Sequence, residues 1–472
     1  MSTKERGHED RAGDGRGRLW QLILVLALAC IVLARLPFLS NTLVGEEGYF
    51  AALAVDSGKP ASLRLGEALV VGRLHGKEIT VPPEHPILPY ALLGRVWRKC
   101  WGQKEMREST LAAWSLRART PYFILFLAGL LLLLAGCRRQ LFGSGACAGP
   151  LPTFLIAFVL LSPLVVGGSI QPQLDGSIGA LLVCSAGFFL TRSDRSPTVG
   201  KACMWAAGAG VVAAMGKNEW TLAFAAALLL VGLARWKMRS SRRFTAWPIL
   251  AALAGVMIGS IIHYSIDPAN YLGGLHVMRR TSVYTSSWGT TFQSRLFWVW
   301  PLFSLIVLAV WMLWRTHSVH AGSRYGESTI LLWGLALTAG FFLSPWNGDG
   351  FPRYFCPPLL VILFWYILVL ERTPLSRRAR FGLTAALVAG TLFHLTSLYG
   401  FARDGVSITS HPGRNLSLME ARWQSQKAQQ QRTGRPAITD AAFGYYYPDT
   451  DYLALSLGDE TAKKLLREHG WR

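Results

Sequence analysis

Charged residues are scarce in this sequence, and acidic residues are scarcer than basic ones. Only 16% of the 472 residues are charged, 27 acidic against 48 basic, while 51% are hydrophobic. A soluble domain of this length would carry charge on roughly a quarter of its residues. The apolar residues also form long segments, and the mean hydropathy is +0.30. An ordinary soluble protein is therefore excluded, and a polytopic membrane protein is predicted.

Cysteine is also sparse, and it lacks the spacing of a metal site. The chain has seven cysteines, an odd number, and none of them form a CxxC pair. Most fall in or beside apolar segments, where cysteine acts as a small core residue. This pattern argues against a disulfide framework and against a zinc site. The positions are Cys30, Cys100, Cys137, Cys147, Cys184, Cys203 and Cys356.

The excess of basic residues gives the chain a formal net charge of +21. The lysines and arginines lie in short loops between the apolar segments. This arrangement is typical of topology signals and of contact with anionic lipid headgroups. The sequence thus predicts membrane lipids as partners and no nucleic acid.

Eleven apolar segments predict an all-α bundle of about eleven transmembrane helices. Several are shorter than the ~20 residues that a bilayer core demands, so we expect flanking polar residues to extend them. The first is long for a signal-peptide core and lacks a convincing cleavage site, which indicates a retained anchor. In order, the segments are Trp20–Phe38, Thr120–Gly136, Leu151–Gly168, Ile178–Leu190, Ala202–Met215, Thr221–Trp236, Ala246–His263, Leu296–Trp314, Thr329–Leu343, Phe355–Leu370 and Phe381–Tyr399.

Basic loops predict which way the bundle is oriented. They follow the second, fourth, sixth, eighth and tenth segments, on the side of the basic N-terminus if the helices alternate. The positive-inside rule places that side in the cytoplasm. The C-terminal tail then faces outward, where short helices such as Thr461–Glu468 are expected. The loop residues are Arg138, Arg139, Arg192, Arg195, Lys201, Arg235, Lys237, Arg239, Arg242, Arg243, Arg315, Arg372, Arg377, Arg378 and Arg380.

The topology divides the chain into three parts. A cytoplasmic tail (1–18) precedes a transmembrane domain (19–400), and an outward-facing extension (401–472) follows it. The transmembrane domain includes two long outward loops, 40–119 and 265–295. We expect the first of these loops to carry surface helices.

Two adjacent carboxylates, Glu46 and Glu47, lie just beyond the first apolar segment in the stretch LVGEEGYF. Carboxylates near a membrane surface are costly to desolvate, and they usually face a water-filled cavity or a partner. The alternative is that they are solvated loop residues capping a short helix over 47–55. There a carboxylate favours the helix dipole by up to ~1 kcal/mol.

Five motifs at the outward ends of the segments occur in an order that resembles the GT-C superfamily of polyprenyl-phosphate-dependent glycosyltransferases. Within it, the bacterial aminoarabinose transferase and protein O-mannosyltransferase group is the most similar. The resemblance extends over residues 20–370. The motifs are GEEGYFAALAVD (Gly45 to Asp56), PPEHPILPYALLGRVW (Pro82 to Trp97), LSPLVVGGSIQPQLDGSIGALLV (Leu161 to Val183), AAMGKNEW (Ala213 to Trp220) and FPRYFCPPLLVIL (Phe351 to Leu363).

The resemblance implies roles for three carboxylates. Glu46 matches the family's first acidic residue and would be the general base that deprotonates the acceptor. Glu47 would orient that base, bind the acceptor or cap a helix. Asp175 would bind the acceptor or sugar, or assist the base. The alternative for Asp175 is a turn residue before Gly176, where aspartate is common.

The resemblance also implies a set of cations around the leaving phosphate. Lys217, Arg353 and His85 would stabilise its negative charge, and Tyr354 accompanies Arg353 in the last motif. The alternative for Arg353 is an interfacial residue that snorkels to the membrane surface. The alternative for His85 is a structural loop residue.

Glu84 and Tyr49 are further candidates for substrate binding. Glu84, with Glu46 or His85, also offers oxygen and nitrogen ligands to a divalent cation. No ligand pair has strong metal spacing, so the sequence leaves a metal open and assigns no cofactor.

The sequence departs from the family pattern at three places. The family's Asp-Glu pair is Glu46-Glu47 here, its EKP lysine is His85, and its TKGP motif survives only as GKNE (Gly216 to Glu219). These departures indicate a divergent member with an unusual sugar or acceptor, or one that has lost catalysis.

The expected activity is transfer of a sugar, hexosyl or pentosyl, from a polyprenyl-phosphate carrier to a lipid, glycan or protein acceptor. The reaction would be inverting, with a carboxylate base, at the periplasmic face of a bacterial inner membrane. The rival is a transporter or flippase, but the ionisable residues gather at the outward ends and no internal repeat is evident. A non-catalytic binder of lipid-linked sugar is the third hypothesis.

Overall fold

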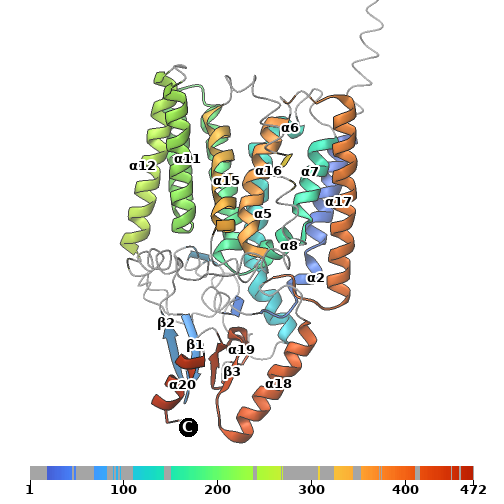
Figure 1. Ribbon diagram of the computed structural model, residues 1–472, viewed down its shortest axis with the longest axis vertical. Helices are drawn as coiled ribbons and strands as arrows, with labels where there is room; N and C mark the ends of the chain where they lie inside the picture. The colour runs from blue at the N-terminus through green and yellow to red at the C-terminus, as the bar shows by residue number, and fades with distance from the viewer. Residues whose placement is uncertain are drawn as a thin grey trace, which may run out of the picture.

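The described residues form a helical bundle with a small sheet-containing region at one end (Figure 1). We call that end the sheet end and the other the opposite end. The computed structural model describes residues 19–44, 47–48, 69–81, 110–142, 150–237, 242–266, 324–343, 352–370, 375–409, 415–447, 449–455 and 459–470, and the isolated positions 89, 92–93, 96, 268, 304, 307–308 and 373.

Six described helices are long and apolar enough to cross a membrane, and a bent pair makes a seventh if it is counted as one span. The chain is an integral membrane protein. The first helix spans Leu19–Leu39 and ends in α2 (Leu36–Leu39). The others are α5 (Leu111–Gly136), α6 (Arg138–Phe142), α7 (Pro150–Leu160), α8 (Pro163–Ile170), η3 (Leu174–Ile178), α9 (Gly179–Asp194), α10 (Val199–Ala214), α11 (Asn218–Lys237), α12 (Arg242–Ile266), α15 (Tyr325–Leu343), η7 (Pro352–Phe355), α16 (Cys356–Leu370) and α17 (Arg377–Arg403).

The predicted helical membrane fold is confirmed, although its number of spans is not. Nearly every predicted apolar segment coincides with a described helix. Leu296–Trp314 lies almost wholly outside the described residues. The third segment is bent by 61° between α7 and α8. The number eleven therefore stays a prediction.

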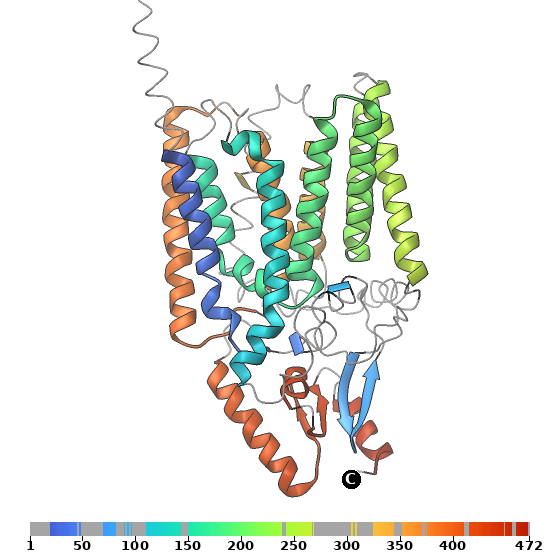
Figure 2. The same cartoon turned by 180° about the vertical axis from the view of Figure 1, so that it is seen from behind.

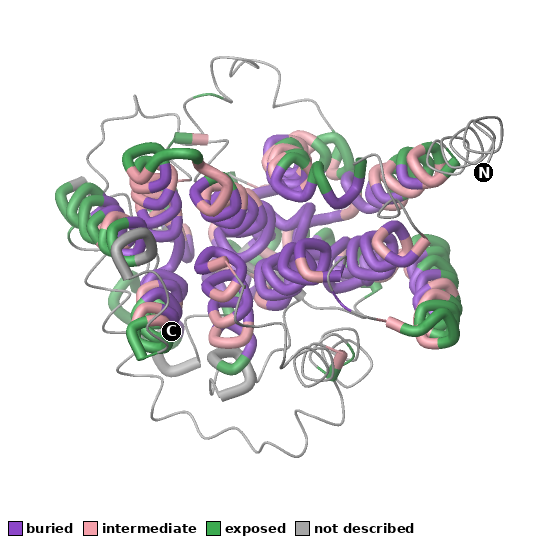
Figure 3. Tube along the Cα trace, turned by 90° about the horizontal axis from the view of Figure 1, so that it is seen from above, coloured by how far each residue is buried: buried purple, intermediate pink, exposed green. Residues whose placement is uncertain are grey.

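The core of the bundle is packed around α16. Almost every side chain of this helix is buried, whereas α17 exposes its outer face, with Phe381 77% and Tyr399 69% accessible. Helices at the centre are accordingly buried all round, and peripheral ones are exposed on one side (Figure 3). This pattern is expected of a bundle whose outer surface meets lipid.

Helices α10 and α12 approach each other closely because glycines lie between them. A Cβ atom added at Gly210 would be 2.0 Å from the backbone oxygen of Ala252, and one at Gly255 would be 2.1 Å from that of Ala207. Only glycine fits such contacts, and small residues are the usual means of close helix packing in membranes.

Beyond the bundle, the loop that follows the first helix and the C-terminal extension share one four-stranded sheet (Figure 2). Strands β1 (Leu69–Leu74) and β2 (Lys77–Val81) form a hairpin whose turn residues, His75 and Gly76, both have positive φ, as a tight hairpin turn requires. Strand β4 (Tyr452–Ala454) pairs antiparallel with β1 and parallel with β3 (Ala437–Thr439).

Three helices lie in the described part of the extension. They are α18 (Leu416–Thr433), α19 (Ala441–Tyr446) and α20 (Asp459–Glu468). The predicted helix Thr461–Glu468 is confirmed as part of α20. The sheet itself was not predicted, because its strands are short and its two halves are joined by β1 and β4, which pair Gly72 with Leu453 from distant parts of the sequence. The division at residue 400 stays a prediction; α17 continues to Arg403, and the extension shares its sheet with the first loop.

Candidate active site

Asp175 lies in a loop that interrupts the helical path at the sheet end. The α8 helix ends at Ile170, and Pro172 disfavours the helical conformation of the residue before it. The chain then forms the π-helical turn η3, in which Gly176 has non-helical angles (φ −94°, ψ −111°). A Cβ at Gly176 would lie 2.4 Å from the backbone oxygen of Gly168. The loop therefore needs glycine at this position.

Lys217 comes from a second break, between α10 and α11, and contacts Asp175 directly. The two side chains form an ion pair of 2.7 Å between Nζ and Oδ2, and they are only 9% and 5% exposed. The ammonium group also lies 5.1 Å from the centre of the Tyr354 ring, a cation–π contact. Three predicted site residues from three distant segments thus meet in one buried cluster, which we call the lysine cluster (Asp175, Lys217 and Tyr354).

The lysine cluster favours the charged form of Lys217. Burial alone lowers the pKa of this side chain, but the negative charge of Asp175, with smaller contributions from Tyr354 and Glu219, outweighs burial and raises the pKa above its ordinary value. The ammonium is therefore protonated at neutral pH. A buried, oriented cation of this kind suits an anionic ligand.

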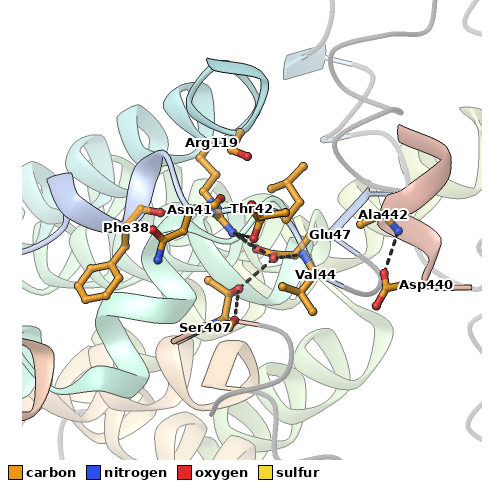
Figure 4. A network of polar contacts seen from close by, with 12 residues as sticks. Phe38, Asn41, Thr42, Val44, Glu47, Arg119, Ser407, Asp440 and Ala442 are labelled. Atoms are coloured by element: carbon orange, nitrogen blue, oxygen red, sulfur yellow. Dashed lines mark hydrogen bonds and ion pairs between the residues drawn. The ribbon is translucent and has the colours of Figure 1, made fainter. Parts of the chain in front are cut away.

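Glu47 lies in a second buried network, which we call the glutamate network (Figure 4). Its side chain is fully buried. Both carboxylate oxygens accept hydrogen bonds from Nη2 of Arg119 at 3.1 Å. Oε2 also accepts from the backbone N–H of Val44 at 2.8 Å and from the hydroxyl of Thr409 at 2.9 Å. The carboxylate is thus satisfied by α5, by its own segment and by the C-terminal extension.

The segment before Glu47 is also bound by α5 and by the C-terminal extension. Arg119 Nη1 donates to the backbone oxygens of Phe38, at 3.0 Å, and Asn41. Tyr446 of α19 accepts a hydrogen bond from the N–H of Leu43 at 2.6 Å. An apolar cluster that includes Leu43, Val44, Leu416, Trp423, Phe443 and Tyr446 packs around these contacts.

Searches of known proteins found one kind of likeness, in structure. No protein-family model and no curated protein sequence matches the chain. The crystal structure of ArnT from Cupriavidus metallidurans in the apo state superimposes with a TM-score of 0.58, at 14% identity, over 95% of this chain and 88% of that one. The same enzyme bound to undecaprenyl phosphate superimposes with a TM-score of 0.53, at the same identity and coverage. The fold is GT-C-like.

In this GT-C-like bundle, the described part of the site holds four of the predicted residues. Asp175, Lys217 and Tyr354 meet, and Glu47 lies in a network of its own. Glu46, Tyr49, Glu84 and His85 lie outside the described residues, as does the side chain of Arg353. No group of three or more potential metal ligands occurs within the described residues. The described residues therefore neither support nor contradict the divalent cation that the sequence left open.

Arg119 and Thr409, the two side chains that bind Glu47, were not predicted from the sequence. The sequence does indicate a role for Arg119, because a charged residue beside the apolar segment Thr120–Gly136 needs a partner in a membrane helix. It gives no such indication for Thr409, because an extension threonine has no pattern that marks it.

A third missed residue, Arg35, supports the GT-C-like bundle from within. Its fully buried guanidinium donates to the backbone oxygens of Ile31 and Leu160 and to the Ser169 hydroxyl, and it lies 4.6 Å from the centre of the Phe126 ring. The two backbone oxygens belong to helix ends at a break, where carbonyls lack helical partners and a cation is favourable.

Arg35 is also connected to the loop that carries Asp175. The backbone oxygen of Ser169 accepts a hydrogen bond from the hydroxyl of Ser177 at 2.7 Å. A buried chain of polar contacts thus runs from the first helix, through α8, to the π-helical turn.

Proposed function

We propose that the protein is a glycosyltransferase that moves a sugar from a polyprenyl-phosphate carrier to an acceptor at the sheet end of the bundle. The observation that carries the proposal is the lysine cluster, a buried cation held by a carboxylate and an aromatic ring at the sheet end of a GT-C-like bundle. The likeness to an ArnT structure bound to undecaprenyl phosphate supports the choice of a polyprenyl carrier.

The membrane orientation follows from the basic helix ends. The ends that carry Arg138, Arg192, Arg235 and Arg377 lie at the opposite end from the sheet (Figure 1). The positive-inside rule assigns that end to the cytoplasm. The sheet end, with the site and the C-terminal extension, then faces the periplasm of a bacterial inner membrane.

In the proposed reaction, Lys217 stabilises the negative charge that remains on the polyprenyl phosphate as the sugar leaves. Arg353 and His85 supply further positive charge, and Tyr354 contacts the phosphate. Asp175 holds the Lys217 ammonium in place, and we assign it to binding a sugar or acceptor hydroxyl as well. A low-polarity, buried site strengthens each of these electrostatic interactions.

Glu46 is the proposed general base, which takes the proton from the acceptor as the acceptor attacks the anomeric carbon. Glu47 positions the segment that carries Glu46, because its own carboxylate is buried and occupied by Arg119 and Thr409. Glu84 and Tyr49 are assigned to substrate binding. One base suffices for an inverting displacement, so no covalent sugar–enzyme intermediate is involved.

Transfer assays with purified protein in nanodiscs test this function. A panel of sugars on undecaprenyl phosphate is offered with membrane extract as the source of acceptor, and wild type is compared with Lys217→Ala and Glu46→Gln. We expect each substitution to lower transfer by ~10²-fold or more, in line with the loss of one oriented charge or base. Lys201→Ala, an exposed lysine at the opposite end, is the matched control and should be as active as wild type.

Two outcomes would count against the proposal. Wild type that binds the carrier but transfers no sugar from any panel member would favour a non-catalytic binder. Movement of labelled carrier across a liposome membrane without transfer would favour a flippase.

A further inference from the structure

Gln173 carries a buried side-chain NH2 group that has no hydrogen-bond partner in the described protein. The residue is only 1% exposed, and its Nε2 atom has no hydrogen-bond partner among the described residues. An amide N–H that is removed from water without a partner destabilises a fold. Buried polar groups are paired in the great majority of cases, so an unpaired one needs a physical explanation.

Both backbone polar groups of Gln173 are hydrogen-bonded, so only its side-chain NH2 group lacks a partner among the described residues. The N–H of Gln173 donates to the backbone oxygen of Gln171 at 2.8 Å, and its backbone oxygen accepts from the N–H of Gly176 at 3.1 Å. Gln173 is also the residue that precedes the π-helical turn η3. The loop thus fixes the backbone of Gln173 and leaves its amide to be satisfied by something outside the described protein.

Gln173 lies close to the lysine cluster. It is two residues before Asp175, so the two Cα atoms are at most about 7.6 Å apart. Asp175 is already paired with Lys217, whose ammonium is a donor with no accepting ability. The Gln173 amide, two residues from this pair on the same loop, offers a second kind of donor, one that suits an oxygen atom of a ligand drawn in by the positive charge of Lys217.

We propose that the Gln173 side-chain amide donates a hydrogen bond to an oxygen of the lipid-linked donor held at the lysine cluster. This inference rests on the proposed function and assigns Gln173 as a substrate-binding residue. The acceptor is a phosphate oxygen or a sugar hydroxyl, since both are oxygen acceptors attached to the same carrier. The unsatisfied amide in the ligand-free protein is then explained, because the donor completes its hydrogen bonding.

Replacing Gln173 should change the melting temperature and the affinity for the donor in different ways. Gln173→Met removes the unsatisfied amide and keeps an unbranched side chain of similar length. The ligand-free variant should therefore melt at the same temperature as wild type or higher. Its affinity for the donor should fall roughly 10-fold, the equivalent of about 1.4 kcal/mol.

Gln140→Met is the matched control. Gln140 is also buried, on α6 at the opposite end, but its Oε1 accepts a hydrogen bond from Arg195 at 3.1 Å. Removing a satisfied amide should lower the melting temperature and leave donor affinity unchanged. Gln173→Glu is the second test variant, because a carboxylate there repels an anionic phosphate and should weaken binding further than methionine does.

The experiment measures melting temperature and equilibrium binding in nanodiscs for undecaprenol, undecaprenyl phosphate and a sugar-bearing undecaprenyl phosphate. Loss of affinity for both phosphate-bearing lipids supports a bond to phosphate, and loss for the sugar-bearing lipid alone supports a bond to the sugar. Equal affinity of wild type and Gln173→Met for every lipid overturns the inference. If wild type binds the phosphate-bearing lipids no better than undecaprenol, the proposed function itself fails, and the inference fails with it.

Discussion

The buried ion pair between Glu47 and Arg119 gives the most direct test of how the site is held together. The two side chains are 0% and 1% exposed, and the carboxylate accepts four hydrogen bonds. Glu47→Gln keeps the shape of the side chain but removes its charge, which leaves the Arg119 guanidinium buried without a counterion in this network. Breaking one partner of such a pair costs about 3–5 kcal/mol.

A loss of this size is a large fraction of the 5–15 kcal/mol that stabilises a typical folded protein. It is measurable as a shift in denaturant-induced unfolding followed by tryptophan fluorescence. Trp423 packs in the same apolar cluster as Leu43 and Val44, so its emission reports on this region. We expect the transition of Glu47→Gln to move to lower denaturant concentration.

The matched control is Glu468→Gln on α20, where the partner Lys464 lies 3.8 Å away and the two side chains are 52% and 74% exposed. Surface pairs of this kind contribute little, so no measurable shift is expected. The double variant Glu47→Gln with Arg119→Gln should be less destabilised than the sum of its single variants, because it leaves no unpaired charge. Equal behaviour of Glu47→Gln and Glu468→Gln would refute the argument from burial.

Three further tests concern the lysine cluster and its supports. Because the pKa of Lys217 is raised above its ordinary value, the contribution of its charge to donor binding is present below that value and lost only as pH rises through the raised one; in a His85→Ala variant, which removes the titrating histidine of the proposed site, affinity should stay flat from pH 6 to about 9, and a decrease centred near pH 8 would contradict this. Gly176→Ala places a Cβ 2.4 Å from the backbone oxygen of Gly168 and should displace the loop, lowering donor affinity and melting temperature together. Arg35→Met removes the donors to two helix-end carbonyls, and we expect a loss of several kcal/mol in unfolding free energy together with reduced transfer.

The helices were predictable from the sequence because apolar runs of membrane length have few alternatives. The order of the motifs predicted only that Asp175 and Lys217 lie at the same edge of the bundle. The direct ion pair depends on how α9, α10 and α11 pack, with Lys217 at the start of one helix and Asp175 in a π-helical turn. Neither the turn nor the pairing has a sequence signal of its own.

The sheet and the partners of Glu47 were not predictable for a related reason. Strands of three to six residues carry little periodicity, and most of the bundle separates β1 from β4 in the sequence. The hairpin turn is then fixed by Asp451, whose carboxylate accepts the N–H groups of His75 and Gly76 at 2.9 and 3.2 Å. Such contacts are consequences of tertiary structure and follow from no local pattern.

The proposed mechanism assigns different roles to the two adjacent glutamates. A base must exchange a proton with its substrate, so it needs an accessible oxygen and room for an acceptor. Glu47 has neither, because Arg119, Thr409 and Val44 occupy its carboxylate. Successive side chains in a helix or strand point in different directions. The contacts of Glu47 therefore do not determine the contacts of Glu46. Glu46→Gln should therefore abolish transfer without changing the unfolding transition, whereas Glu47→Gln should lower stability first and transfer as a consequence. The C-terminal extension contributes Thr409 and Tyr446 to this anchoring, which makes it part of the machinery that positions the proposed base.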